Sequence, residues 1–206
     1  SMSSLVYSQT SQQYFEYGNS KFQKNDYKGA IEDYNKAIEL NSRFAKAYAN
    51  RASAKTELGD NEGAVLDFDK SIEIDPNSPF AFNSRGLVKY RMEDYQGAIM
   101  DYTKAIELDP NNSFLYNERG SIKVIMQDYS GALLDFTKLI ELEPQNMSAY
   151  VTRANIFLML NDGAKAILDI NRVLGTDPNN KTANFLRGMI EFNVNDYKRA
   201  ILDFTR

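Results

Sequence analysis

The residues whose type and spacing could do chemistry in this sequence are two sets of opposite charge. Each set recurs at a fixed interval, and we call it a column. Arginine recurs every 34 residues, and aspartate recurs with the same period. The planar guanidinium group of arginine can bond a carboxylate through two parallel hydrogen bonds. A catalytic pair would be expected once, not copied along the chain, so we interpret these columns as a structural ladder of ion pairs. Its members are Asp33, Arg51, Asp67, Arg85, Asp101, Arg119, Asp135, Arg153, Asp169 and Arg187, with Asp203 continuing the acidic column.

The start of the arginine column suggests how the two columns pair. The first repeat has Tyr17 where the later repeats have arginine. This is expected if each arginine bonds the aspartate of the preceding repeat, because the first repeat has no predecessor. The sequence therefore predicts the pairs Asp33–Arg51, Asp67–Arg85, Asp101–Arg119, Asp135–Arg153 and Asp169–Arg187. A shorter lysine column would support the same aspartates, at Lys21, Lys55, Lys89 and Lys123.

The elements that must position these charges also repeat every 34 residues, which is typical of a repeat array. The sequence predicts an N-terminal lead-in segment at 1–10, which begins with residues left from a purification tag. One repeat array is predicted over 11–206. Each unit holds two apolar-periodic segments of helical length. The break between them falls at an aspartate that can cap the second helix, and a proline stops most units. The predicted repeats are 11–44, 45–78, 79–112, 113–146, 147–180 and a truncated 181–206.

Small and aromatic residues explain how the helices of a repeat would pack. Glycine or alanine stands at the eighth place of every repeat, although glycine inside a helix costs about 1 kcal/mol relative to alanine. We interpret this as a steric demand for close approach of the two helices. The column consists of Gly18, Ala52, Gly86, Gly120, Ala154 and Gly188. A column of alanines on the second helix would meet it, at Ala30, Ala64, Ala98, Ala132, Ala166 and Ala200, and the aromatics around this contact are predicted to be core.

This pattern of an aromatic, a small residue, alanine, a second aromatic and proline resembles the tetratricopeptide repeat family. The resemblance covers 11–206. It implies an all-α fold, a right-handed α-solenoid superhelix of about six antiparallel helix-turn-helix repeats. It also implies a concave groove, lined mainly by the first helix of each repeat, that binds peptide segments of other proteins. The sequence departs from the family pattern at the arginine column, at Leu139 and Val173, and at Asn184 in the last repeat.

The concave groove can be assigned to residues of this chain. The face of each first helix opposite its packing face mixes aromatic, aliphatic and asparagine side chains, whereas a solvated face should be polar. Exposed apolar groups with polar neighbours are typical of a binding surface, and asparagine offers both a donor and an acceptor to a peptide. The predicted groove residues are Asn19, Phe22, Asn50, Phe80, Asn83, Leu87, Tyr90, Phe114, Asn117, Val124, Val151 and Asn155.

One subtype of the family binds the C-terminal carboxylate of chaperones, and its pattern is broken here. Asn19 and Asn50 match two of its positions. Phe15 stands where that clamp needs a lysine, and Phe80 and Ser84 stand where it needs a lysine and an arginine. The groove therefore suits a more apolar, extended or helical peptide.

Composition excludes several other classes. The net charge is −4 with acidic and basic residues interspersed, which disfavours nucleic-acid binding. No apolar run is long enough to cross a membrane. The chain lacks cysteine and histidine, and no phosphate loop, metal cluster or nucleophile–base pair is visible. We therefore expect no enzyme activity and no cofactor. A cytoplasmic location is favoured, with a periplasmic one if a signal segment was removed.

These observations predict a protein-protein interaction scaffold that binds a peptide segment of a partner protein. Two alternatives stay open. The chain could be the interaction or regulatory arm of a larger enzyme or signalling protein. It could also self-assemble through its last helix, where Ile201 and Phe204 lack a following repeat to cover them.

Overall fold

The computed structural model describes residues 9–206, so the predicted lead-in at 1–10 lies almost wholly outside the described residues. Within the described part, the chain forms twelve α-helices and no strand. No helix in this part is long and apolar enough to span a bilayer. The chain divides into two compact units, an N-terminal unit ending at Asp109 and a C-terminal unit spanning Pro110–Arg206. The predicted single array at 11–206 is therefore described below as two units.

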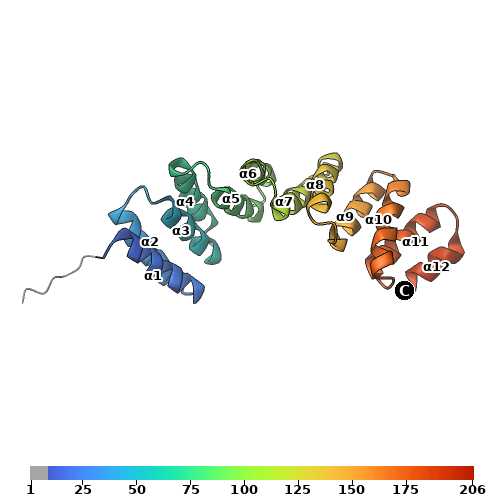
Figure 1. Ribbon diagram of the computed structural model, residues 1–206, viewed down its shortest axis with the longest axis horizontal. Helices are drawn as coiled ribbons and strands as arrows, with labels where there is room; N and C mark the ends of the chain where they lie inside the picture. Colours follow the sequence, from blue (N-terminus) through green and yellow to red (C-terminus); the bar gives the residue numbers. More distant parts are fainter. Residues whose placement is uncertain (1–8) are drawn as a thin grey trace, which may run out of the picture. The chain divides into compact units, whose positions relative to one another are not determined.

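The N-terminal unit consists of three antiparallel helix pairs (Figure 1), each helix contacting the next along the chain. We call the first helix of each pair helix A and the second helix B. The A helices α1, α3 and α5 also contact one another in sequence, and so form one face of the unit. The helices are α1 (Ser11–Gln23), α2 (Tyr27–Leu40), α3 (Ala45–Glu57), α4 (Asn61–Ile74), α5 (Pro79–Arg91) and α6 (Tyr95–Leu108).

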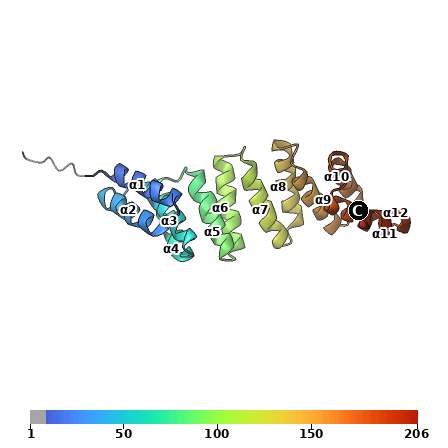
Figure 2. The ribbon, with the colours of Figure 1, turned by 90° about the horizontal axis from the view of Figure 1, so that it is seen from below.

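The C-terminal unit repeats this arrangement with three more pairs, most easily followed for α7 and α8 in Figure 2. Its last helix has 8 residues, whereas the other B helices have 14. The helices are α7 (Ser113–Ile125), α8 (Tyr129–Leu142), α9 (Met147–Met159), α10 (Gly163–Thr176), α11 (Lys181–Asn193) and α12 (Tyr197–Phe204).

The predicted aspartate caps are confirmed at the start of all six B helices within the described residues. Each side chain accepts a hydrogen bond from the backbone N–H three residues on, as Asp26 does from Gly29 at 3.0 Å. Such a bond satisfies one of the free amides of the first turn. The caps are Asp26, Asp60, Asp94, Asp128, Asp162 and Asp196.

The small residues at the eighth place of each repeat lie against the B helix, as predicted, but their nearest neighbours differ from the prediction. The alanine column of the B helices is buried. However, a Cβ added at Gly18 would lie 2.5 Å from the ring of Tyr34, and one at Gly188 would lie 2.7 Å from the ring of Phe204. Aromatic rings rather than alanines therefore account for the glycines at these two places.

The charged columns form a ladder, but the predicted pairing is wrong. Each arginine bonds the aspartate of its own repeat, as Arg153 does with Asp169 through two bonds of 2.8 Å. The two residues face each other because helices A and B of one repeat run antiparallel. The pairs Asp33–Arg51, Asp67–Arg85, Asp101–Arg119, Asp135–Arg153 and Asp169–Arg187 are therefore corrected to Arg51–Asp67, Arg85–Asp101, Arg119–Asp135, Arg153–Asp169 and Arg187–Asp203.

The arginines Arg51, Arg85 and Arg153 also bond the preceding repeat through Nη1. Nη1 of Arg51 donates to Asn35 at 2.6 Å, and Nη1 of Arg85 donates to Asp69 at 2.5 Å. Each acceptor lies two residues after the aspartate that the sequence predicted. The first repeat has Tyr17 at the place of these arginines. Its aspartate, Asp33, bonds Lys21 at 2.7 Å.

The lysine column supports the aspartates as predicted. The four lysine Nζ atoms lie 2.7 to 2.9 Å from the carboxylate of their own repeat. The column ends at the fifth repeat, where Phe157 packs beside Arg153, and the sixth repeat has Glu191 at this place.

Candidate functional site

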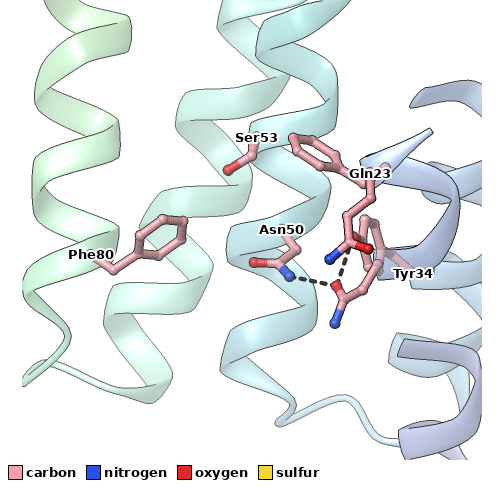
Figure 3. Close-up of a pocket in the computed structure, with 7 residues that line it drawn as sticks. Gln23, Tyr34, Asn50, Ser53 and Phe80 are labelled. Atoms are coloured by element: carbon pink, nitrogen blue, oxygen red, sulfur yellow. Dashed lines mark hydrogen bonds between the residues drawn. The ribbon is translucent and has the colours of Figure 1, made fainter. Parts of the chain in front are cut away.

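The candidate site is a hollow of about 330 Å³ on the A helices of the N-terminal unit (Figure 3). Helices α1, α3 and α5 each contribute side chains, and α2 contributes one from beneath. The size and the mixture of aromatic and amide groups are typical of a small-molecule or side-chain pocket. The lining residues are Asn19, Phe22, Gln23, Tyr34, Asn50, Ser53 and Phe80.

A hydrogen-bonded trio forms the polar part of the hollow. The side-chain oxygen of Asn19 accepts from the hydroxyl of Tyr34 at 2.9 Å and from the amide of Asn50 at 2.7 Å. Tyr34 is 1% exposed, and its burial raises the pKa of its hydroxyl to about 12. The hydroxyl therefore stays protonated at neutral pH and remains able to donate. This fixed group orients the Asn19 amide, which in turn orients Asn50.

Two phenylalanines supply the apolar part. Phe22 is half-buried and packs edge-on against Tyr27, with ring centroids 5.3 Å apart. Phe80, on the first turn of α5, leaves 50% of its surface exposed. Its ring stands across the hollow from Asn50 in Figure 3. Together the two rings form an apolar surface beside the amides of the hollow, an arrangement typical of a binding surface.

The structure brings together four of the predicted groove residues of the N-terminal unit. Asn19, Phe22, Asn50 and Phe80 line one hollow. The other three predicted residues of this unit lie on α5 outside it: Asn83, Leu87 and Tyr90.

The remaining predicted residues belong to the C-terminal unit. Phe114 on α7 is 51% exposed, and Asn117 donates to the neighbouring Glu118 at 3.0 Å. Val151 on α9 packs against the core of this unit, so part of its role is structural. The other two are the half-buried Val124 and Asn155.

Three lining residues were not among the predicted site residues: Gln23, Tyr34 and Ser53. Ser53 follows Asn19 by one repeat and lies on the helical face that was expected to form the groove wall. Tyr34 was assigned to the core only. The available signal was its hydroxyl, because a tyrosine replaces phenylalanine where a buried polar partner is present.

A second hollow, of about 420 Å³, lies in the C-terminal unit and contains an unusual carboxylate pair. Glu191 occupies the place of the lysine column, beside Asp203. Burial and the neighbouring Asp203 raise the pKa of Glu191. The hydrogen bonds from Arg187 lower the pKa of Asp203. Arg187 thus pairs with Asp203, and its hydrogen bonds in the described part of the chain do not include Glu191.

The raised pKa predicts a pH-dependent gain in stability from Glu191→Gln. Between the ordinary and the raised pKa, the folded chain binds more protons than the unfolded chain, so stability falls as pH rises through this window. The variant should therefore melt higher than the wild type at pH 7. This difference should vanish below about pH 4, where glutamate is protonated in both states. Thermal melts across pH measure it, with exposed Glu57→Gln as the control; an equal difference at all pH values would contradict the prediction.

Among the described residues, no group of three or more histidine, cysteine, aspartate or glutamate side chains could hold a metal ion. The hollow on α1, α3 and α5 is the candidate site because it combines aromatic and amide side chains in one concave surface.

The fold places this protein among the helical-repeat proteins. Sequence models of the family match residues 18–55, described as TPR repeat, and residues 45–78, 79–112 and 117–181, described as tetratricopeptide repeat. The chain belongs to the tetratricopeptide repeat family. No curated protein sequence matches it.

Solved structures agree with this fold. MamA has a TM-score of 0.75 at 20% identity, covering 82% of this chain and 92% of MamA. YrrB, described as a TPR protein with an unusual peptide-binding site, has a TM-score of 0.72 at 21% identity, covering 83% of this chain and 88% of YrrB. The first TPR of Spaghetti (RPAP3), bound to an HSP90 peptide, has a TM-score of 0.57 at 27% identity, covering 61% of this chain and 99% of its own. Family and fold together support a protein-interaction scaffold.

Proposed function

We propose that this protein binds a peptide segment of a partner protein on the A-helix face of its N-terminal unit. The hollow between α1, α3 and α5 carries the proposal, because it combines a half-exposed Phe80 with the oriented amides of Asn19 and Asn50. Peptide binding by YrrB and by the RPAP3 repeat, as their descriptions state, supports the same use of this fold.

A chaperone-tail carboxylate clamp is the alternative use of this face, and the residues disfavour it. None of the seven residues lining the hollow is charged. Phe15, at one lysine position of such a clamp, packs against Phe44 with ring centroids 4.9 Å apart. A carboxylate placed here would lose its hydration without gaining a cation.

The proposal predicts that Phe80→Ala combined with Asn50→Ala weakens peptide binding at least tenfold. Truncating a central aromatic anchor typically has this effect, since tenfold corresponds to about 1.4 kcal/mol. The probes are peptides selected from a random phage-displayed library against the full chain, and fluorescence polarisation measures their affinity. Met100→Ala is the matched control, because Met100 is 65% exposed on a B helix.

Unchanged affinity of the selected peptides for the double variant would place the binding surface elsewhere. Circular dichroism should show equal helix content in all variants, because both substituted side chains lie at the surface of the hollow and not in the core.

A further inference from the structure

The hydrogen-bonded trio of the hollow leaves the amide nitrogen of Asn19 and the side-chain oxygen of Asn50 without a bond in the described part of the chain. The oxygen of Asn19 is already bonded by Tyr34 and Asn50. Within the described residues, the amide nitrogen of Asn19 and the side-chain oxygen of Asn50 have no further partner. In Figure 3 the Asn50 oxygen points away from the Asn19 bond, toward the side where Phe80 lies. The N–H groups of Asn19 and the oxygen of Asn50 complement the C=O and N–H of a peptide backbone.

The apolar part of the hollow lies beside these two groups. Phe22 from α1 and Phe80 from α5 belong to the same lining as the asparagines. A charged side chain entering this space would lose hydration without a counter-ion, whereas an aliphatic or aromatic one would gain from the removal of apolar surface from water. In extended-peptide recognition, main-chain bonds give affinity and such pockets select the side chain.

We infer that the hollow selects one large uncharged side chain, aliphatic or aromatic, from a segment internal to the partner chain. The adjacent backbone bonds the amide nitrogen of Asn19 and the oxygen of Asn50. This inference rests on the proposed peptide-binding function and specifies what that site recognises. A segment bearing a chain-terminal carboxylate is disfavoured, because no cation is present among the lining residues.

The test uses two random peptide libraries against the full chain, one displayed between two folded domains and one with free C-termini. We expect the internal library to be enriched, with Leu, Ile, Met, Phe, Tyr or Trp dominating one position. Ser53→Phe should weaken these peptides at least tenfold, because the new ring fills the hollow. The Ser53 hydroxyl bonds only within its own helix, to the backbone oxygen of Ala49, so little else should change.

Ser121→Phe is the matched control, because Ser121 occupies the same repeat position on α7 and is exposed. This variant should bind the selected internal peptides as the wild type does.

The outcomes separate this inference from the proposed function. One outcome would overturn the inference and leave the function standing. In it, Phe80→Ala abolishes binding of the selected peptides, but these peptides share a charged residue at their common position or require a free C-terminus. Binding that persists in both Ser53→Phe and the Phe80→Ala/Asn50→Ala variant would overturn both. Enrichment of no peptide from either library would also count against both.

Discussion

Replacing Asp169 by alanine should lower the free energy of unfolding by about 3 to 5 kcal/mol, the usual cost of breaking a buried ion pair by removing one partner. The side chains of Arg153 and Asp169 are 17% and 7% exposed, and two hydrogen bonds join them. In this repeat, Phe157 replaces the lysine that supports the aspartate in four other repeats. The variant would therefore leave the guanidinium of Arg153 partly buried without its carboxylate.

A double-mutant cycle tests the register of the ladder. Urea unfolding of the single and double alanine variants should give a coupling energy of about 0.5 to 3 kcal/mol between Arg153 and Asp169. The coupling between Arg153 and Asp135 should be much smaller, because Asp135 bonds Arg119 and Lys123. Stronger coupling to Asp135 would contradict the pairing within each repeat.

Phe136→Ala and Phe114→Ala should change stability by very different amounts, although both remove a phenylalanine from the C-terminal unit. Phe136 is 1% exposed, and its loss should cost about 3 to 5 kcal/mol of stability. Phe114 is 51% exposed, and its loss should change stability by about 0.5 kcal/mol or less. Denaturant unfolding measures both. Equal losses would show that Phe114 also belongs to the core.

The different burial of Phe136 and Phe114 follows from how strongly each position is repeated along the sequence. The place of Phe136 is aromatic in four of the other five repeats, at Tyr34, Phe68, Tyr102 and Phe204. The fifth repeat has Ile170 there. Tyr34, Phe68, Tyr102 and Ile170 are at most 1% exposed, so this side chain fills the interior of its helix pair. Position 114 varies from repeat to repeat, as expected for a residue that packing does not require.

Much of the fold could be predicted from the sequence because its signals are local. The aspartate caps depend only on a side chain and an amide three residues away. The helix pairs depend on apolar periodicity within one segment. These features do not depend on how neighbouring repeats pack against each other.

The ladder register could not be predicted because sequence separation does not distinguish the two pairings. Arg51 is 16 residues from Asp67 and 18 from Asp33 (51 − 33), and both aspartates lie on B helices next to α3. Arg51 and Arg85 do contact the preceding repeat, but at Asn35 and Asp69 and not at the predicted aspartates.

The candidate site shows a similar division. The helical face that carries Asn19, Asn50 and Phe80 could be derived from periodicity. The bond between the two asparagines could not, because it depends on how closely α1 and α3 approach and on the Tyr34 hydroxyl beneath them. Of the predicted groove residues, the hollow contains Asn19, Phe22, Asn50 and Phe80, all on α1, α3 and α5.

Photo-crosslinking tests the proposed binding site most directly. A benzoylphenylalanine in place of Phe80 should crosslink a partner protein from extracts of the cells that naturally express this protein. A selected peptide should reduce the yield of this crosslinked product. The same group in place of Met100, on the B-helix side, should not crosslink the partner. If position 100 traps the same protein as efficiently as position 80, or if the peptide does not compete, the hollow is not the binding site.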